Sequence, residues 1–252
     1  QGYQILSDHN SVGHWSYLNG VVDYRGWWYY FPLVLWYKLT LPIMILFGLA
    51  IVFFRKNHRD FLEESLLIVP IVSFMILAMT SKIDIGIRHI LPILPFLYIF
   101  ISRLMMSRNL FLKSMAAALV IGQIIIGILA FPNYLAYFNQ IAGGSKGGIK
   151  HLTDSNLDWN QNMKRFGQYA KEKNIKKVYS LCWDQDSFRY YGVGNEILPN
   201  EPVKGVVAIC AQQLMVPPDG FEFSWVTKFP PDDNVGSSIY IWRFDLKPVE
   251  LR

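Results

Sequence analysis

Three basic side chains beside apolar stretches suggest the chemistry of this sequence. Lys38 stands inside an apolar run that four aromatic residues lead, while Arg88 and His89 stand just before another apolar run. A cation buried near lipid is costly unless it faces a partner or a wet cavity, so such residues are functional candidates. Desolvated cations also stabilise the charge on a departing phosphate. The alternatives are that Lys38 snorkels back to lipid headgroups and that His89 is a polar residue of the membrane interface.

The apolar runs around these cations predict membrane helices. Residues 26–32 read GWWYYFP, which is typical of the aromatic belt at a membrane surface. The roughly 24 residues that follow Tyr30 reach about 36 Å as a helix, which is long enough for a tilted crossing. The second run has a short core that contains Pro70, so taken alone it also fits a buried or re-entrant helix. We expect four spans, at about residues 31–54, 61–80, 90–106 and 110–131.

Positive charge is distributed unevenly among the connections, and this predicts the orientation of the spans. The connection at residues 82–89 holds two Lys or Arg residues, and the N-terminal loop from Gln1 holds only Arg25. Because cytoplasmic connections carry the excess of Lys and Arg, we place the richer connections inside. Lys38, Arg88 and His89 then converge on the outer surface of the membrane. The richer connections carry Arg55, Lys56 and Arg59 after the first span, and Arg103, Arg108 and Lys113 around the end of the third.

The rest of the chain has the pattern of a globular domain. Strand patterns alternate with helical patterns after Pro132, which indicates a compact α/β layer structure. We therefore expect two regions, a transmembrane region at residues 1–132 with an extracytoplasmic N-terminal loop, and an extracytoplasmic α/β domain at residues 133–252. The predicted helices lie at 159–173 and 186–191, and the predicted strands at 177–183, 205–211 and 238–244.

Several classes of function are disfavoured by the residues present. The net charge of +5 comes partly from basic residues between apolar runs, and no basic run with interleaved aromatic residues indicates nucleic acid. The five histidines are not spaced as metal ligands. Residues 154–165 begin like a calcium loop, but Trp159 and Arg165 stand where such a loop needs Gly and Glu. Residues 143–148, GGSKGG, lack the spacing of a phosphate loop, so we expect a flexible surface turn. We expect neither a metal nor a cofactor.

Two cysteines are too few for a disulfide scaffold. Cys182 and Cys210 both lie in predicted strands of the α/β domain. We favour two buried thiols on neighbouring strands. The alternative is one disulfide, because a domain outside the cytoplasm lies in an oxidising compartment.

Three groups of segments together resemble one enzyme family. The resemblance covers most of residues 13–166 and is carried by the order and spacing of its motifs. It is to the polyprenyl-phosphate-dependent glycosyltransferases of family 39, the protein O-mannosyltransferase and aminoarabinose-transferase-like group with the glycosyltransferase C fold. Asn160 and Asn162 depart from its usual Gly and Asp. The matching segments are GHWSYLNG at 13–20, GWWYYFP at 26–32, KLTLP at 38–42, IGIRHILPILPFL at 85–97, NYLAYFN at 133–139 and DSNLDW at 154–159.

This resemblance implies a membrane enzyme that transfers a hexose or pentose from a polyprenyl phosphate to an acceptor at the outer membrane face. Protein glycosylation or cell-envelope modification is the implied process. We expect Lys38 and Arg88 to contact the donor phosphate, and His89, His14 and Tyr17 to make supporting polar contacts. The family's general base is an acidic residue of an earlier extracytoplasmic loop, and no segment here matches that loop. We therefore assign no catalytic residue and expect a C-terminal fragment whose missing N-terminal part supplies the base.

The predicted fold is an α-helical multi-pass membrane protein with four transmembrane helices and a C-terminal extracytoplasmic α/β domain. We place it in the plasma or inner membrane, in contact with membrane lipid and a polyprenyl-phosphate sugar. The alternative function is a non-enzymatic membrane receptor or sensor with an extracytoplasmic binding domain. A transporter has less support, because we find no inverted repeat. An acidic pair in a loop upstream of Gln1 would favour the transferase over the sensor.

Overall fold

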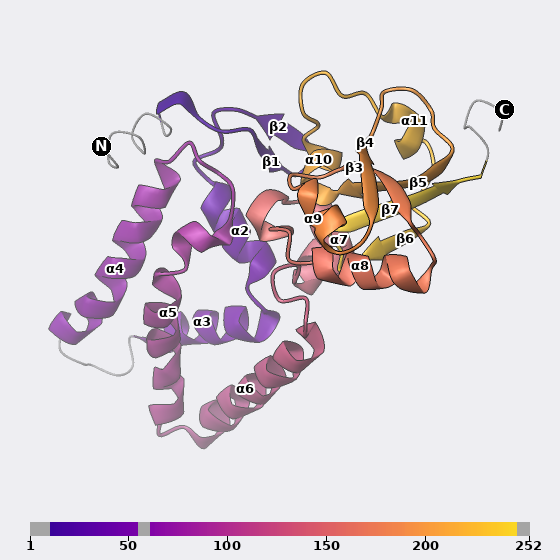
Figure 1. The fold of residues 1–252 in the computed structure, drawn as a ribbon. Helices are drawn as coiled ribbons and strands as arrows, with labels where there is room; N and C mark the ends of the chain where they lie inside the picture. The colour runs from indigo at the N-terminus through magenta and orange to yellow at the C-terminus, as the bar shows by residue number, and fades with distance from the viewer. Residues whose placement is uncertain (1–10, 55–60, 246–252) are drawn as a thin grey trace. The chain divides into compact units, whose positions relative to one another are not determined.

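The computed structural model describes residues 11–54 and 61–245, and the chain divides into two compact units (Figure 1). We call residues 11–16 with 23–148 the helical unit, and residues 17–22 with 149–245 the α/β unit. The second unit thus begins at Ile149 and also takes in a short segment from near the start of the chain.

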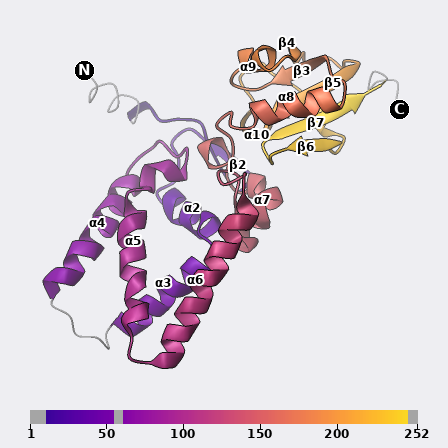
Figure 2. The same cartoon turned by 60° about the horizontal axis from the view of Figure 1, so that its bottom comes forward.

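The helical unit has a core to which three helices contribute. Apolar side chains of α3, α5 and α6 meet there, among them Leu46, Phe100 and Ala116, each at most 5% exposed. Figure 2 shows these helices arranged around the base of the unit. The elements are α2 (Tyr30–Lys38), α3 (Leu41–Phe54), α4 (Phe61–Met79), η1 (Ile87–Ile90), α5 (Ile93–Ser102), η2 (Arg103–Met106) and α6 (Leu110–Ala130).

The expectation of four transmembrane helices is wrong. Among the described residues, only α6 is by itself long and apolar enough to cross a membrane. Residues 30–53 meet the same criterion only as the pair α2 and α3, which is bent by 115°. The apolar parts of α4 (Ser65–Met79) and of the third run (Ile93–Met106) are shorter. The described part of the chain therefore offers one or two candidate spans within a mixed fold of ten α-helices and two sheets of seven strands in all.

Prolines explain why the predicted spans are interrupted. Pro42 lies in the first turn of α3 and has no N–H to donate to the carbonyl group of Lys38, so the helix cannot run through this point. Leu39 is extended, with ψ of 140°, and the chain turns there. In the third run, Pro92 stands just before α5, which has only ten residues. The basic connection at 55–60, used above for orientation, lies outside the described residues.

The α/β unit contains a five-stranded mixed sheet in the order β4-β3-β5-β7-β6. β3 pairs in parallel with β4 and β5, while β7 pairs antiparallel with β5 and β6. A separate two-stranded sheet is formed by β1 (Ser16–Leu18) and β2 (Val21–Asp23). The strands of the large sheet are β3 (Lys177–Leu181), β4 (Gly194–Ile197), β5 (Gly205–Cys210), β6 (Asp233–Val235) and β7 (Ile239–Phe244).

Helices cover both faces of this sheet. Phe166 of α8 and Phe188 of α9 pack with one set of strand residues. Val226 of α11 packs with the other set, which includes Val207 and Trp242. Adjacent residues of a strand point to opposite faces, so the two cores lie on opposite sides of the sheet. The helices are α8 (Met163–Glu172), α9 (Asp186–Tyr190), α10 (Ala211–Met215) and α11 (Ser224–Thr227).

Short helical turns connect the two units along the chain. The GGSKGG segment forms helical turns, not the flexible surface turn that we expected. Its Gly148 is packed so closely against the ring of Phe138 that a side chain would not fit. The turns are η3 (Gln140–Ala142), α7 (Gly144–Gly147), η4 (Gly148–Lys150) and η5 (Asp154–Asn156).

Candidate functional site

The ammonium group of Lys38, at the end of α2, is bound by backbone carbonyl groups. Its Nζ donates to the carbonyl oxygens of Leu135 at 2.6 Å and Tyr137 at 2.7 Å, and lies 4.2 Å from the centre of the Phe138 ring. A cation held in this way neither snorkels to headgroups nor presents a free charge to a ligand. Lys38 therefore holds the segment at 134–139 against α2.

Asn139 completes this attachment from the opposite side. Its side-chain Nδ2 donates to the carbonyl oxygens of Trp36 at 2.6 Å and Leu39 at 2.7 Å, and its backbone N–H donates to that of Tyr37 at 3.0 Å. The last carbonyl groups of a helix lack intrahelical partners. The fully buried Asn139 donates the hydrogen bonds that these groups accept. Lys38 and Asn139 thus join two segments that the family resemblance had picked out separately.

Arg88 and His89 lie together on η1. Both side chains are exposed, and Arg88 Nε is 3.4 Å from His89 Nε2. The His89 ring centre is 6.3 Å from that of Phe31, in an edge-on arrangement, and the fully buried Ile90 fixes η1 in place. Desolvation of the ring and the charge of Arg88 lower the pKa of His89, which favours the neutral imidazole. This pair can offer a guanidinium group and a neutral imidazole to an anion.

Asp84 is a candidate that our sequence reasoning missed. It is 1% exposed, and its Oδ2 accepts a hydrogen bond of 2.6 Å from the backbone N–H of Trp27. Its Oδ1 is buried and has no hydrogen-bond partner among the described residues. Burial raises the pKa of Asp84 to about 7, although the bond from Trp27 opposes the rise. The signal that could have found it is a carboxylate between apolar residues in the IDIGIRH segment.

The other two predicted contact residues, His14 and Tyr17, make hydrogen bonds to backbone carbonyl groups. His14 Nδ1 lies 2.9 Å from the carbonyl oxygen of Trp15, and the His14 N–H donates to Tyr24 O. Tyr17 is buried in the α/β unit, where its hydroxyl donates to Lys150 O at 3.2 Å.

Of the five predicted residues, the structure brings together only Arg88 and His89 as an exposed pair. Lys38 is the last residue of α2, whereas Phe31, which contacts His89, is in its first turn. The nine residues of α2 extend for about 13 Å, so Lys38 and Arg88 do not form one phosphate site in this arrangement. The geometry leaves the exposed pair as the candidate anion site of the helical unit.

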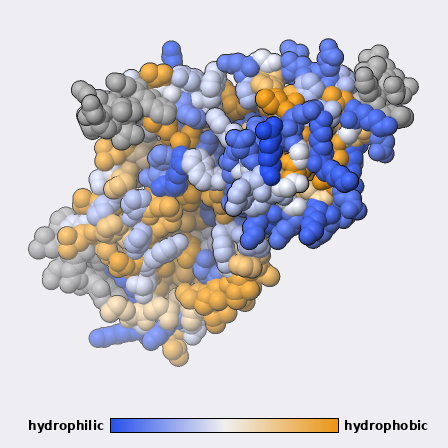
Figure 3. All heavy atoms as spheres, in the orientation of Figure 1, coloured by the Kyte–Doolittle hydropathy of each residue, from blue (hydrophilic) through white to orange (hydrophobic). Residues whose placement is uncertain are grey.

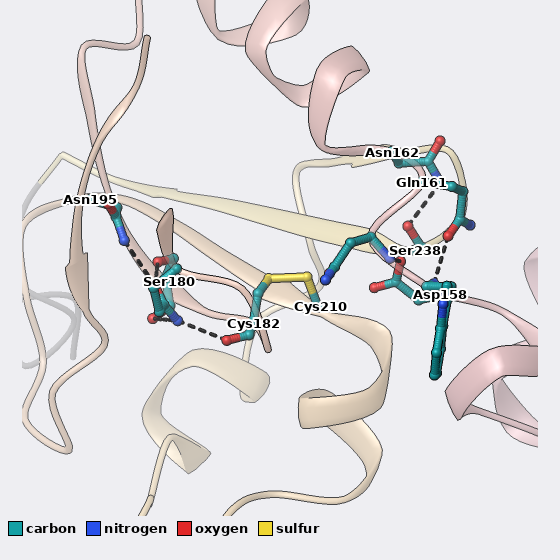
Figure 4. Close-up of a disulfide and its surroundings, with 11 residues drawn as sticks. Asp158, Gln161, Asn162, Ser180, Cys182, Asn195, Cys210 and Ser238 are labelled. Carbon is teal, nitrogen blue, oxygen red and sulfur yellow. Dashed lines mark hydrogen bonds between the residues drawn. A yellow bond between two sulfur atoms is a disulfide. The ribbon is translucent and has the colours of Figure 1, made fainter. Parts of the chain in front are cut away.

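In the α/β unit, a disulfide and a polar loop lie at the same end of the strands of the sheet (Figure 4). Cys182 and Cys210 are bonded, with Cα atoms 5.0 Å apart, so the favoured interpretation as two thiols is wrong. Cys210 ends β5 and Cys182 directly follows β3, which makes them neighbours across a parallel pair as expected. The bridge therefore ties together the carboxyl ends of two adjacent strands.

The DSNLDW segment begins the polar loop beside this bridge. Asp158 is 9% exposed and accepts a hydrogen bond of 3.1 Å from Asn160 N–H. Asn162 Nδ2 donates to Ser238 Oγ at 2.9 Å and to Gly236 O at 3.2 Å. Burial raises the pKa of Asp158 to about 6, while bonds from Asn160 and Ser238 lower it. These contacts attach the loop to the chain entering β7.

No grouping of three or more His, Cys, Asp or Glu that could hold a metal ion occurs within residues 11–54 and 61–245. Compared with known proteins, the chain matches no family model, no curated protein and no solved structure.

Proposed function

We propose that this chain is part of a membrane-embedded glycosyltransferase that takes its sugar from a polyprenyl phosphate. The observation that carries the proposal is the exposed Arg88–His89 pair, placed on a short turn of a helical unit with an apolar surface. A guanidinium group binds phosphate oxygens through several charge-assisted hydrogen bonds. The resemblance described above supplies the substrate class.

Exposed apolar side chains support a location in lipid. Leu129 of α6 is 78% exposed and Leu66 of α4 is 71% exposed. Figure 3 shows hydrophobic residues over much of the helical unit, whereas the visible face of the α/β unit is mostly hydrophilic. Apolar surface of this extent is covered in a stable protein by lipid or by a partner. Trp28 and Trp36 are also exposed, and tryptophan favours the membrane interface.

The disulfide supports an extracytoplasmic position for the α/β unit. A bridge such as Cys182–Cys210 persists in oxidising compartments and is rare in the cytosol. The C-terminal part of the chain then lies on the outer face, in agreement with the orientation inferred from positive charge.

In the proposed reaction, the bond between the anomeric carbon of the sugar and the phosphate oxygen breaks, and the phosphate leaves with the electron pair. The acceptor oxygen bonds to the same carbon. Its proton passes to a carboxylate, which the family resemblance places in an earlier loop. Arg88 stabilises the charge that develops on the leaving phosphate. The lipid-linked sugar is the substrate, and Lys38 acts by holding the segment around Tyr137.

The test is a transfer assay with the full-length protein in nanodiscs. It is supplied with radiolabelled lipid-linked sugars extracted from its own membranes, and transfer to acceptor is counted. We expect transfer by the wild type, with a rate at least about tenfold lower for Arg88→Ala, because a charge-assisted hydrogen bond contributes about 1.5–3 kcal/mol.

The matched control is Arg108→Ala, another exposed arginine of the helical unit, beyond the opposite end of α5 from η1. It should retain the wild-type rate. No transfer by the wild type, together with saturable binding of the lipid-linked sugar, would contradict the proposal and favour a receptor or sensor.

A further inference from the structure

The carboxyl group of Asp84 joins two segments that carry the proposed donor site. On one side is the Trp27 turn, which leads into α2 and the Phe31 ring; on the other is the connection that leads into η1 with Arg88 and His89. Gly26 is in the left-handed region, with φ of +68°, and a side chain there would overlap the Asp84 carboxyl group. The two segments therefore meet in close contact at Asp84.

The protonation state of this carboxyl group follows from its surroundings. The side chain is nine-tenths or more buried, and Oδ1 is without a hydrogen-bond partner among the described residues. An ionised carboxylate left partly unpaired in the interior costs far more than the neutral acid. We call the arrangement with the Asp84–Trp27 hydrogen bond closed. Burial raises the pKa of Asp84 to about 7, so the group is mostly uncharged in the closed arrangement at pH 6 and mostly ionised at pH 8.

The residues around Asp84 offer few charges that would change this balance. The end of α4 at 76–80 and the start of α2 at 30–34 contain no charged residue. Besides Asp84, the charged or titratable groups of the two joined segments, residues 23–30 and 82–89, are Asp23, Tyr24, Arg25, Tyr29, Tyr30, Lys82, Arg88 and His89. The Lys82 ammonium is exposed and donates to Ser11 O at 3.2 Å.

We propose that Asp84 is a positioning residue for the Arg88–His89 pair: its uncharged carboxyl group holds the connection before η1 to the Trp27 turn, and its ionisation releases that connection. Ionisation adds a buried charge that only hydration can relieve, so the connection must open to water. The link to donor binding rests on the proposed function. If only the closed arrangement binds the donor, the apparent affinity follows the fraction of uncharged Asp84.

The first test measures the closed arrangement without any ligand. Hydrogen–deuterium exchange of the Trp27 amide is followed in the full-length protein between pH 6 and pH 8, corrected for intrinsic exchange. Protection in the wild type should fall about tenfold over this range, as the uncharged fraction falls. Asp84→Asn keeps an acceptor oxygen and remains uncharged, so its protection should not depend on pH. Constant protection in the wild type would overturn the proposal even if the variants fail to fold.

The second test measures binding of undecaprenyl phosphate in nanodiscs at both pH values. Because other groups of the protein and the phosphate itself can also change with pH, the quantity compared is the ratio of the wild-type Kd to the Asp84→Asn Kd. This ratio should rise about tenfold from pH 6 to pH 8. Asp84→Leu, which is uncharged but lacks the acceptor, should bind weakly at both pH values.

The two tests separate the proposal from the function on which it rests. Binding whose ratio stays constant would overturn the role of Asp84 and leave the proposed function standing. A wild type that binds no undecaprenyl phosphate at either pH would overturn the proposed function and the link to the donor. In that case, hydrogen–deuterium exchange of the Trp27 amide still shows whether Asp84 holds the connection before η1 to the Trp27 turn.

Discussion

Lys38 and Asn139 each donate hydrogen bonds to residues about 100 positions away in the sequence. Lys38 donates to two backbone carbonyl groups of the segment at 134–139, and the Asn139 side chain donates to two at the end of α2. Both side chains donate to backbone carbonyl groups, and a backbone group that loses its hydrogen-bond partner away from water is costly. This explains a lysine in an apolar run without a ligand.

We therefore predict that Lys38→Met destabilises the protein. Methionine has a similar length but cannot donate, so two carbonyl groups lose their partner. The free energy of unfolding, measured by chemical denaturation in detergent micelles, should fall by about 2–4 kcal/mol. Lys113→Met, at an exposed position of α6, is the control and should change it by less than about 0.5 kcal/mol. Equal stability of the two variants would show that Lys38 has no such role.

Asp158 should make stability depend on pH. Its pKa of about 6 in the folded protein is above the usual value of 3.8, so the folded state binds the proton more tightly. Stability contributed by this group is present below about pH 4, falls as the pH rises towards about 6, and is constant above that. When denaturation is measured at a series of pH values, the free energy of unfolding of the wild type should fall by about 2–3 kcal/mol from about pH 4 to about pH 6 on account of this group. Asp158→Asn should lack this fall. The same decrease in both proteins would contradict this assignment.

The sequence indicated the candidate residues of the site better than their roles. Arg88 and His89 were chosen because they stand together just before an apolar run and in a segment of the family resemblance, and their role in binding stays a prediction. The partners of Lys38 are 97 and 99 residues away, and no spacing rule could connect them. Asp84 was treated as part of a polar connection, because burial of a single carboxylate depends on how segments distant in sequence pack around it.

At the scale of elements, the strands with strong apolar patterns were predictable. β3, β5 and β7 lie within the predicted ranges 177–183, 205–211 and 238–244. β4, with the sequence GNEI, and β6, with DNV, were missed because Gly, Asn and Asp have low strand propensity. Pairing with β3 and β7 at the edges of the sheet makes them strands, and this tertiary contribution is not visible in a local pattern.

The largest error of the sequence-based prediction was the expectation of four transmembrane helices in the helical unit, and its reason is related. Apolar composition indicates that a residue avoids water, but it does not indicate whether consecutive residues continue in one direction. The 115° bend between α2 and α3 depends on Pro42 and on Asn139, whose side chain donates hydrogen bonds to the carbonyl groups left without helical partners at the break. Only the proline was visible in the local sequence.

The disulfide gives a prediction for the joined strands β3 and β5. It closes a loop between residues 28 positions apart, so in the chain-entropy model it contributes about 3–4 kcal/mol to stability. Cys182→Ala combined with Cys210→Ala should lower the midpoint of thermal unfolding. A reductant should lower the midpoint of the wild type but leave that of the double variant unchanged. Equal midpoints for the wild type and the double variant would contradict the predicted contribution.

For the whole molecule, two kinds of surface argue for two environments. The helical unit exposes large apolar side chains on α3, α4 and α6, whereas the α/β unit has two buried cores around its sheet. The net charge of +5 includes Arg103, Arg108 and Lys113 near the start of α6. Basic residues at one end of an apolar helix favour the cytoplasmic side, so if α6 crosses a membrane its start is expected inside and its end at Ala130 outside.

The central claim is that Arg88 binds the phosphate of a lipid-borne sugar. The most direct measurement is the Kd of undecaprenyl phosphate for the full-length protein in nanodiscs at pH 6. We predict saturable binding by the wild type, and at least about tenfold weaker binding by Arg88→Ala, with Arg108→Ala unchanged. The same Kd for Arg88→Ala and the wild type, or an equal loss in both variants, would contradict the account.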